Sequence, residues 1–340
     1  ANVCPARKAL VLARANSSQT GNWMRAYTLA LEKPDSGNRL KHLILRDGRT
    51  MAYTDLGHPQ GYPLIFGHGM PGSRLQGRLF HNQALRHGFR FLTPDRPGIG
   101  SSSDQPERRL LDYPQDILQL ADALGLERFT HIGWSSGGSR ALACCHSLSD
   151  RMDLGVCLSG YTNFSEYDGR HTLLEKTRWP GPLLARYSPK LTTLLVRLVA
   201  WLSLRYPGLY MREARKMVNA SDRDLMGVLL SGNTFRQDQL VCLESGGKAI
   251  AADLLAELSD WGFSLKQVST HVLIFQGEQD AFVPLEYARH LAEQLPNAEL
   301  ILLTTAGHLY PLDEKFQARL FERIRRQLTD RTIQKRVQPS

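Results

Sequence analysis

Short apolar runs of strand length recur along most of the chain, and each run ends at polar or turn-forming residues. Residues 42–48 and 50–57 follow one another closely and predict a β-hairpin that opens a sheet. Further runs of the same kind predict additional strands at residues 63–69, 89–95, 128–134, 154–160, 271–277 and 299–305. The pattern therefore predicts a protein built around a β-sheet.

Helical periods fill the intervals between most of these runs. Apolar residues recur at helical spacing in residues 113–127, 135–148 and 284–295. Strands that alternate with helices are typical of a mostly parallel sheet, because each crossover helix returns the chain over one face of the sheet. The predicted fold class is α/β, with helices on both faces.

One long interval, between Gly160 and His271, interrupts this alternation. It contains several helical patterns and few strand-like runs, although a crossover between parallel strands needs only about a dozen residues. We therefore predict an inserted helical cap, or lid, at residues 161–261. The remaining predicted parts are an N-terminal extension, a core in two pieces and a basic C-terminal tail, at residues 1–38, 39–160, 262–330 and 331–340.

Composition and charge narrow the class of protein. Of the 340 residues, 42% are hydrophobic and 22% are charged, as in ordinary globular proteins. The net charge is +9, and much of the excess lies in residues 178–216 and 321–336, without a recognisable nucleic-acid-binding module. The longest apolar stretch, residues 191–204, is interrupted by Arg197 and is shorter than the roughly 18–20 residues that span a bilayer. We expect no nucleic-acid partner and no integral membrane segment.

The cysteines and the N-terminal residues bear on location. Five cysteines, an odd number in a large chain, do not indicate a disulfide framework, and no Cys/His spacing indicates a metal site. Cys144, Cys145 and Cys157 lie in apolar patterns, as expected of buried thiols in a reducing compartment. The apolar run at residues 9–13 is shorter than the roughly 7–15 residues of a secretory signal. These features favour a cytoplasmic location.

Residues 133–137, Gly-Trp-Ser-Ser-Gly, are the first candidate for chemistry. Clusters of Gly and Ser are most often simple turns, but this one follows a predicted strand and precedes a predicted helix, the context of the nucleophile elbow G-x-S-x-G. The glycines remove side chains that would clash in a strained turn, and the helix directs its first amides toward the reacting carbon. The pattern selects Ser135 over Ser136, because a shift by one residue would put Trp134 where a small residue belongs.

A base and an acid follow two later strands. His308 comes after the last predicted strand and could accept the Ser135 proton, although a histidine near a strand end is more often an ordinary polar residue. We interpret Asp280 as the acid that orients the imidazole. Glu278 and Asp95 are rivals, since each could be the acid or a cap or turn residue. The order serine, acid, histidine along the chain is the order expected for this kind of sheet.

A loop after an earlier strand completes the candidate set. Acyl transfer needs donors for the oxyanion, and we expect the backbone amides of Met70 and Ser136 to supply them. The alternative interpretation of the Met70 loop is a tight Gly/Pro turn. We interpret residues 95–98 as a structural turn that shapes the loop around the site. We further predict that the substrate pocket is lined by His68, Gly69, Trp134 and Phe282.

Five motifs together carry a resemblance to a known family. HGMPGSR, DRPGIGSS, GWSSGG, GEQDAFVP and AGH occur in the order and approximate spacing of the α/β-hydrolase superfamily. The chain resembles this superfamily over residues 40–330, and its nearest likeness is to cap-bearing esterases, lipases and proline iminopeptidase-like hydrolases. The resemblance implies an eight-stranded, mostly parallel sheet, a helical cap, a triad of Ser135, Asp280 and His308, and no cofactor or metal. The loop HGMPG lacks the second glycine of the proline iminopeptidase loop, which argues against aminopeptidase activity.

The expected function is hydrolysis of a small-molecule carboxylic ester with an apolar acyl or alcohol part. Hydrolysis of an amide or a C–C bond by the same triad is an alternative, and so is a ligand-binding member of the fold without catalysis. The cap segment at residues 182–216 mixes apolar and basic residues. Its Leu194, Leu195, Leu198 and Trp201 either pack the cap onto the core or face lipid, with Arg and Lys near anionic headgroups of a peripheral membrane contact.

Overall fold

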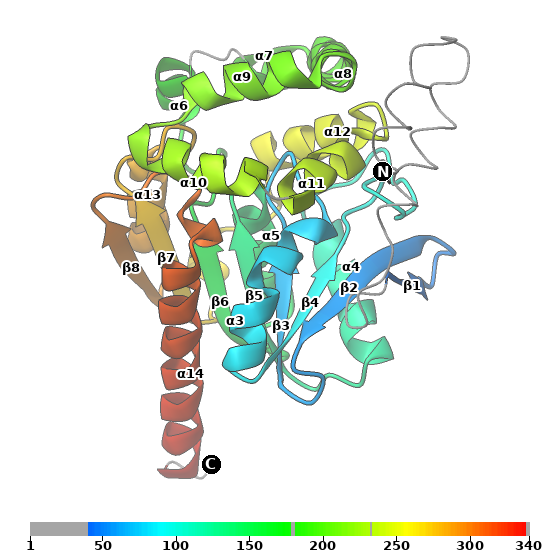
Figure 1. Ribbon diagram of the computed structural model, residues 1–340. Helices are drawn as coiled ribbons and strands as arrows, with labels where there is room; N and C mark the ends of the chain where they lie inside the picture. The colour runs from blue at the N-terminus through cyan, green and yellow to red at the C-terminus, as the bar shows by residue number, and fades with distance from the viewer. Residues whose placement is uncertain (1–39, 178–180, 232, 338–340) are drawn as a thin grey trace, which may run out of the picture. The chain divides into compact units, whose positions relative to one another are not determined.

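A mixed sheet of eight strands forms the centre of the computed structural model, which describes residues 40–177, 181–231 and 233–337. Its order is β1-β2-β4-β3-β5-β6-β7-β8 (Figure 1). The first two strands are antiparallel to their neighbours, and all later pairs are parallel. The strands are β1 (Lys41–Ile44), β2 (Thr50–Gly57), β3 (Tyr62–Gly67), β4 (Phe89–Pro94), β5 (Phe129–Trp134), β6 (Met152–Leu158), β7 (Val272–Gly277) and β8 (Ala298–Leu303).

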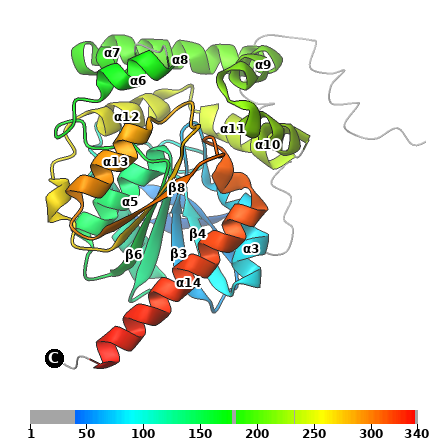
Figure 2. The ribbon, with the colours of Figure 1, turned by 90° about the vertical axis from the view of Figure 1, so that its left-hand side faces the viewer.

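Two apolar layers cover this sheet. On one face α4 (Asp112–Ala123), α5 (Ser136–Ser147) and α13 (Leu285–Gln294) pack against the sheet, and on the other α3 (His81–Arg86) and α14 (Glu314–Val337) do so. Figure 2 shows α5 and α13 on the side of the sheet opposite to α3 and α14. Successive side chains of β3 show the division, because Ile65 belongs to the first layer and Leu64 and Phe66 to the second. Every residue of β5 and β7 is buried, as expected of central strands in a covered parallel sheet. The fold is therefore the α/β arrangement that the pattern predicted.

The chain between β6 and β7 is helical in its described residues. α7–α9 form an outer layer above α10–α12 (Figure 1). These helices occupy the segment that was predicted to form a cap, residues 161–261, and we call them the cap. They are α6 (Arg170–Thr177), α7 (Gly181–Tyr187), α8 (Pro189–Arg205), α9 (Pro207–Met217), α10 (Ala220–Ser231), α11 (Asn233–Leu243) and α12 (Lys248–Leu258).

Short 3₁₀ segments and the chain ends complete the description. The 3₁₀ segments are Arg74–Phe80, Leu265–Gln267 and Tyr310–Leu312. The N-terminal extension assigned to residues 1–38 lies outside the described residues, whereas α14 continues to Val337, into the segment that was set apart as a tail. Among the described helices, none has both the length and the apolar character needed to cross a bilayer.

Strand register brings the carboxyl ends of the parallel strands to one edge of the sheet. Gly67 at the end of β3 pairs with Gly133 near the end of β5, and Gly277 at the end of β7 pairs with Leu303 at the end of β8. The loops that follow these strands therefore start side by side. All four of these loops carry sequence-predicted site residues, so the register determines where any shared chemistry can take place.

The turn after β5 leaves no room for side chains at its glycines. A Cβ on Gly137 would lie 2.0 Å from the carbonyl oxygen of Gly67, and one on Gly133 would lie 2.0 Å from that of Gly137. In both cases the opposing atom is backbone and cannot rotate away. Gly227, inside α10, has nothing within 4 Å of such a Cβ.

We predict that Gly137→Ala lowers the free energy of unfolding by about 1–3 kcal/mol or more, because the strand β3 must shift to admit the methyl group. The matched variant Gly227→Ala should raise it by up to about 1 kcal/mol, since alanine is favoured over glycine inside a helix. Urea denaturation followed by circular dichroism measures both. Equal effects of the two variants would show that β3 and α5 are not in close contact.

Candidate active site

Ser135 occupies the tip of the turn between β5 and α5. Its φ of 54° and ψ of −121° lie in a region that non-glycine residues seldom adopt, at a cost of about 1–3 kcal/mol. Two backbone hydrogen bonds of 2.8 Å hold it there: the Ser135 N–H donates to the Leu158 carbonyl, and the Gly138 N–H donates to the Ser135 carbonyl. A strained residue fixed in this way is the geometry expected of a nucleophile elbow.

The two adjacent serines are held differently. Ser136 is the first residue of α5, and its hydroxyl accepts a 2.8 Å hydrogen bond from Arg140 Nη1. The Ser135 hydroxyl makes no hydrogen bond to any other described residue. Ser135 is therefore the serine whose oxygen is available to a substrate, although only 6% of the residue is exposed.

His308 and Asp280 form a buried pair. His308 Nδ1 lies 2.8 Å from Asp280 Oδ2, and Asp280 Oδ1 accepts hydrogen bonds from the N–H groups of Phe282 and Val283 at 2.8 and 2.9 Å. Burial would lower the pKa of His308, but the charge and hydrogen bond of Asp280 outweigh it and raise that pKa above the usual value. Burial would likewise raise the Asp280 pKa, and the same contacts bring it below its usual range.

The rival acids lie elsewhere. Asp95 is buried in an ion pair with Arg74, whose Nη1 lies 2.7 Å from Asp95 Oδ2. Glu278 is exposed. Of the three candidates, the structure thus brings Asp280 alone into hydrogen-bond contact with His308.

Aromatic side chains join the histidine loop to the elbow. Trp134, next to Ser135, donates from Nε1 to the His308 carbonyl at 3.2 Å, and the two rings lie 5.7 Å apart. The Phe282 ring lies 5.2 Å from the His308 ring in an edge-on arrangement. No hydrogen bond joins Ser135 to His308 in the structure, and such catalytic contacts often tighten only when substrate binds.

A carboxylate that the sequence analysis missed lies behind the histidine loop. Asp222, on the cap helix α10, accepts hydrogen bonds from the backbone N–H groups of His308 and Leu309 at 2.7 and 2.9 Å. Burial is the largest influence on its pKa and raises it, against the lowering effect of those two donors. A Cβ on Gly307 would lie 2.3 Å from Asp222 Oδ2. The glycine before His308 was thus the one signal in the sequence of a close neighbour at this place.

The loop after β3 lies against the elbow. A Cβ on Gly69 would lie 3.6 Å from the Cβ of Ser135, and the Gly69 N–H is already bound to Gln76 Oε1 at 2.8 Å. The Met70 N–H donates to no described residue, and the Ser136 N–H belongs to the first turn of α5, where helical amides lack partners. These are the two amides that the sequence analysis assigned to an oxyanion.

His68 lies behind this loop with both ring nitrogens engaged. Nδ1 contacts the Gly69 carbonyl at 2.9 Å, and Nε2 accepts the Arg96 N–H at 3.3 Å. Burial, followed by the charge of Arg96, holds the His68 pKa well below its usual value, which fits a neutral ring. Its contacts position the loop, and its side chain is fully buried.

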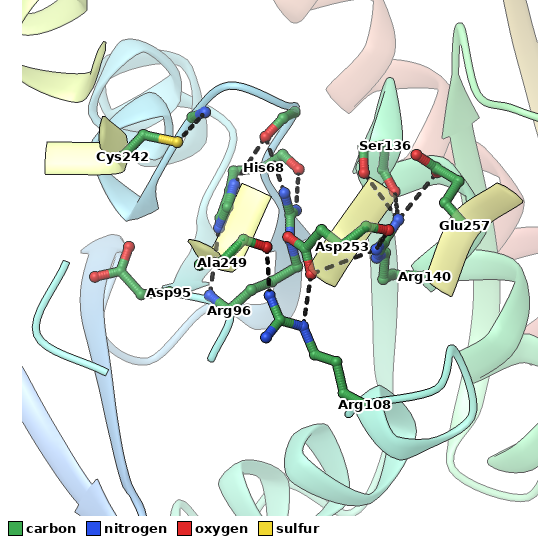
Figure 3. A network of polar contacts seen from close by, with 12 residues as sticks. His68, Asp95, Arg96, Arg108, Ser136, Arg140, Cys242, Ala249, Asp253 and Glu257 are labelled. Atoms are coloured by element: carbon green, nitrogen blue, oxygen red, sulfur yellow. Dashed lines mark hydrogen bonds and ion pairs between the residues drawn. The ribbon is translucent and has the colours of Figure 1, made fainter. Parts of the chain in front are cut away.

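Arg96 connects the loop to the cap. Its Nη1 and Nη2 donate to the carbonyls of His68 and Gly69 at 2.5 and 3.1 Å, and its Nε lies 2.6 Å from Asp253 Oδ2 on α12 (Figure 3). Asp253 Oδ1 also accepts a 2.8 Å hydrogen bond from Arg108 Nε. Burial would raise the Asp253 pKa, but the surrounding arginines lower it far below its usual value. Arg96 belongs to the segment interpreted as a structural turn that shapes the loop around the site, and it holds that loop through the carbonyls of His68 and Gly69.

A second carboxylate of α12 holds the helix after the elbow. Glu257 Oε1 lies 3.0 Å from Arg140 Nη1 and 2.5 Å from Ser139 Oγ, and the same Arg140 nitrogen donates to the Ser136 carbonyl at 2.9 Å (Figure 3). Asp253 and Glu257 are four residues apart and therefore share one face of α12. No set of His, Cys, Asp and Glu side chains among the described residues is arranged to hold a metal ion.

Comparison with known proteins identifies the family of this chain. The family model described as alpha/beta hydrolase fold matches residues 62–315. The chain belongs to this family. It is 28% identical over 237 residues, 66% of this chain and 76% of the relative, to a Caulobacter sp. (strain K31) protein named provisionally as carbamate hydrolase RutD. It is 27% identical over 256 residues, 72% of this chain and 79% of the relative, to the 2-hydroxy-6-oxononadienedioate/2-hydroxy-6-oxononatrienedioate hydrolase of Paraburkholderia phymatum.

A solved structure supports the same fold. A thermophilic esterase from Thermogutta terrifontis superimposes with a TM-score of 0.60 at 20% identity, covering 86% of this chain and 98% of the esterase. The likeness at this identity concerns the fold. Together with the family match, it confirms the α/β-hydrolase fold that the motifs indicated.

We predict that Asp280→Asn lowers kcat for a chromogenic ester by about 10⁴-fold and moves the acid limb of kcat/KM to lower pH. Without the carboxylate, burial dominates and the His308 pKa falls, so the imidazole stays neutral at lower pH. The control Glu278→Gln should leave the profile unchanged. The assignment fails if the control loses activity and Asp280→Asn keeps it.

For Asp222→Asn we predict a fall in kcat of about tenfold and a smaller shift of the acid limb in the same direction. One of the two N–H groups loses its acceptor, and His308 loses a second negative charge that raises its pKa. Steady-state rates against pH measure both effects. A loss of stability without any change in the pH profile would show that Asp222 only supports the fold.

Proposed function

We propose that this member of the α/β-hydrolase family cleaves small carboxylic esters through an acyl-enzyme on Ser135. The observation that carries the proposal is the strained Ser135, with its hydroxyl unbound, on the loop that Trp134 ties to the His308–Asp280 pair. A turn needs neither a strained serine with an unbound hydroxyl nor a buried His–Asp pair beside it. A serine nucleophile needs both, because the histidine must take the proton of the serine hydroxyl.

In the proposed reaction Ser135 Oγ attacks the ester carbonyl carbon while His308 Nε2 takes the hydroxyl proton. The carbonyl electrons move to oxygen, and the N–H groups of Met70 and Ser136 stabilise the oxyanion. Collapse expels the alcohol, which receives the proton from His308. Water then attacks the acyl-enzyme with His308 as base, and Ser135 recovers its proton as the acid product leaves. Asp280 holds the imidazole and stabilises its charged form.

The surroundings of His308 favour an apolar, uncharged substrate. Trp134, Phe282 and Leu309 supply apolar surface beside the imidazole. The buried arginines nearest the elbow and its neighbouring loop, Arg140 and Arg96, are already bound to the carboxylates of Glu257 and Asp253. A dicarboxylate substrate would need a cation that these two arginines do not offer, which places an ester ahead of a dienedioate.

Two other functions are alternatives to ester hydrolysis: one uses the same triad on a different bond, and the other involves no catalysis. The names of the sequence relatives include a carbamate hydrolase and a dienedioate hydrolase, so cleavage of a C–N or C–C bond is the second candidate. A ligand-binding role without turnover is the third. For location we propose the cytoplasm, since the four described cysteines are free and buried, as in a reducing compartment.

We predict that the wild-type protein hydrolyses p-nitrophenyl esters and that Ser135→Ala lowers kcat/KM by about 10⁴-fold or more. Ser136→Ala keeps its backbone N–H and should lose at most about tenfold, which makes it the matched serine control. The acyl chain is varied from acetate to palmitate, and the optimum reports the depth of the apolar site.

The contradicting results are distinct. Equal activity of Ser135→Ala and wild type would show that another group is the nucleophile. Turnover of a p-nitrophenyl carbamate or a hydroxy-oxo-dienoate in place of the esters, still lost in Ser135→Ala, would keep the triad and overturn the ester assignment.

A further inference from the structure

Helix α8 of the cap turns its large apolar side chains outward. Leu194, Leu198 and Trp201 are 63, 48 and 57% exposed, and their spacing places them on one helical face. The buried face of the same helix carries the smaller residues Thr192, Val196, Ala200 and Ser203. Leu194, Leu198 and Trp201 therefore do not pack the cap onto the core, which was one of the two interpretations of this segment, whereas Leu195, named with them there, is half-buried.

Exposed apolar surface is concentrated on this part of the molecule. Within the described residues, the exposed large apolar side chains outside residues 187–217 are Ile44, Leu85 and Leu302, which are scattered over the sheet and α3. All the others belong to the end of α7, to α8 or to α9, apart from Tyr206, which is the residue between α8 and α9. We call the following set the cap surface: Tyr187, Leu191, Leu194, Leu198, Val199, Trp201, Leu202, Tyr206, Leu209 and Met217. Exposed apolar side chains that are concentrated in one part of a molecule indicate an interaction site.

Close packing beneath α8 fixes this orientation. A Cβ on Gly247, just before α12, would lie 2.8 Å from the Cβ of Ala200 and 3.2 Å from the Val196 carbonyl oxygen. The two helices therefore approach at small residues. A rotation of α8 that buried Leu194 and Leu198 would put leucines where only alanine and valine fit.

The charges that α8 and α9 themselves carry are almost all positive. Exposed Lys190, Arg197 and Arg205 lie on α8, and exposed Arg212, Arg215 and Lys216 lie on α9. The acid within these helices is Glu213, which is paired with Lys216 at 3.0 Å and with Arg212 at 3.3 Å. The surface thus combines apolar side chains with an excess of cations, and no described helix can cross a bilayer.

We propose that the cap surface docks the protein on an anionic lipid bilayer, with the leucines and Trp201 at the level of the acyl-chain boundary and the Arg and Lys side chains at the headgroups. The candidate partners for this surface are a second copy of the chain, its own N-terminal residues and a lipid bilayer, and their charges distinguish them. A second copy of this surface would bring cations against cations, and residues 1–31 of the chain carry no acid to complement it. An anionic headgroup layer is complementary to both components of the surface.

The test is co-sedimentation of the full chain with vesicles of phosphatidylcholine alone or of phosphatidylcholine with phosphatidylglycerol. We expect binding to the anionic vesicles that weakens when salt rises from about 0.1 to 0.5 M, since screening acts on the basic residues. The triple variant Leu194→Ser/Leu198→Ser/Trp201→Ser should bind at least tenfold more weakly. Arg197→Gln/Arg205→Gln should bind more weakly and show a smaller salt dependence, because two of the six exposed cations on α8 and α9 are removed.

Matched controls use the scattered exposed residues. Ile44→Ser/Leu85→Ser/Leu302→Ser removes as many exposed apolar side chains away from the cap and should bind as wild type does, and so should Arg46→Gln/Arg109→Gln. Absence of binding by wild type, or equal loss in the controls, overturns the proposal. So does a dimer in sedimentation velocity that only the cap triple variant dissociates, because the cap surface would then serve self-association.

This inference does not rest on the proposed function. Ser135→Ala should bind anionic vesicles as wild type does, because Ser135 is buried and belongs to the core. An inactive protein that binds vesicles would contradict the ester proposal alone. An active protein that ignores vesicles would contradict the docking proposal alone.

Discussion

The buried ion pairs between α12 and the core are the interactions on which the site depends. Asp253 binds Arg96, which holds the carbonyls of His68 and Gly69, and Glu257 binds Arg140, which holds the first turn of α5. One helix of the cap therefore holds both backbone segments that carry the proposed oxyanion donors. Buried charges are tolerated when they are fully paired, and loss of one partner typically costs about 3–5 kcal/mol.

A third cap carboxylate acts in the same way on the other side of the site. Asp222 on α10 holds the backbone of His308 and Leu309, while Asp280 holds the imidazole itself. Through these contacts the cap holds the loop after β3, the first turn of α5 and the loop that carries His308, all of which lie around Ser135, the residue whose backbone strain must be maintained. The core carries the residues that we propose to react, and the cap contributes contacts that keep their loops in place.

Local pattern predicted most of the fold and the core part of the site. Each predicted strand run overlaps an observed strand, and Ser135, Asp280 and His308 each follow the end of a parallel strand, where register alone brings loops together. Asp222, Asp253 and Glu257 escaped prediction because their partners are remote in sequence; Arg96 and Asp253, for example, are 157 residues apart. Nor could helical periodicity reveal that α8 exposes its leucines, since the same spacing serves a buried face equally well.

The central claim, that Ser135 is the activated nucleophile, is tested most directly by a fluorophosphonate probe followed by mass spectrometry of the modified peptide. The probe reacts with serines that a neighbouring base activates. The account predicts one adduct on Ser135, abolished in Ser135→Ala and strongly slowed in His308→Ala. An unmodified protein, or an adduct on Ser136 with Ser135 untouched, would contradict it.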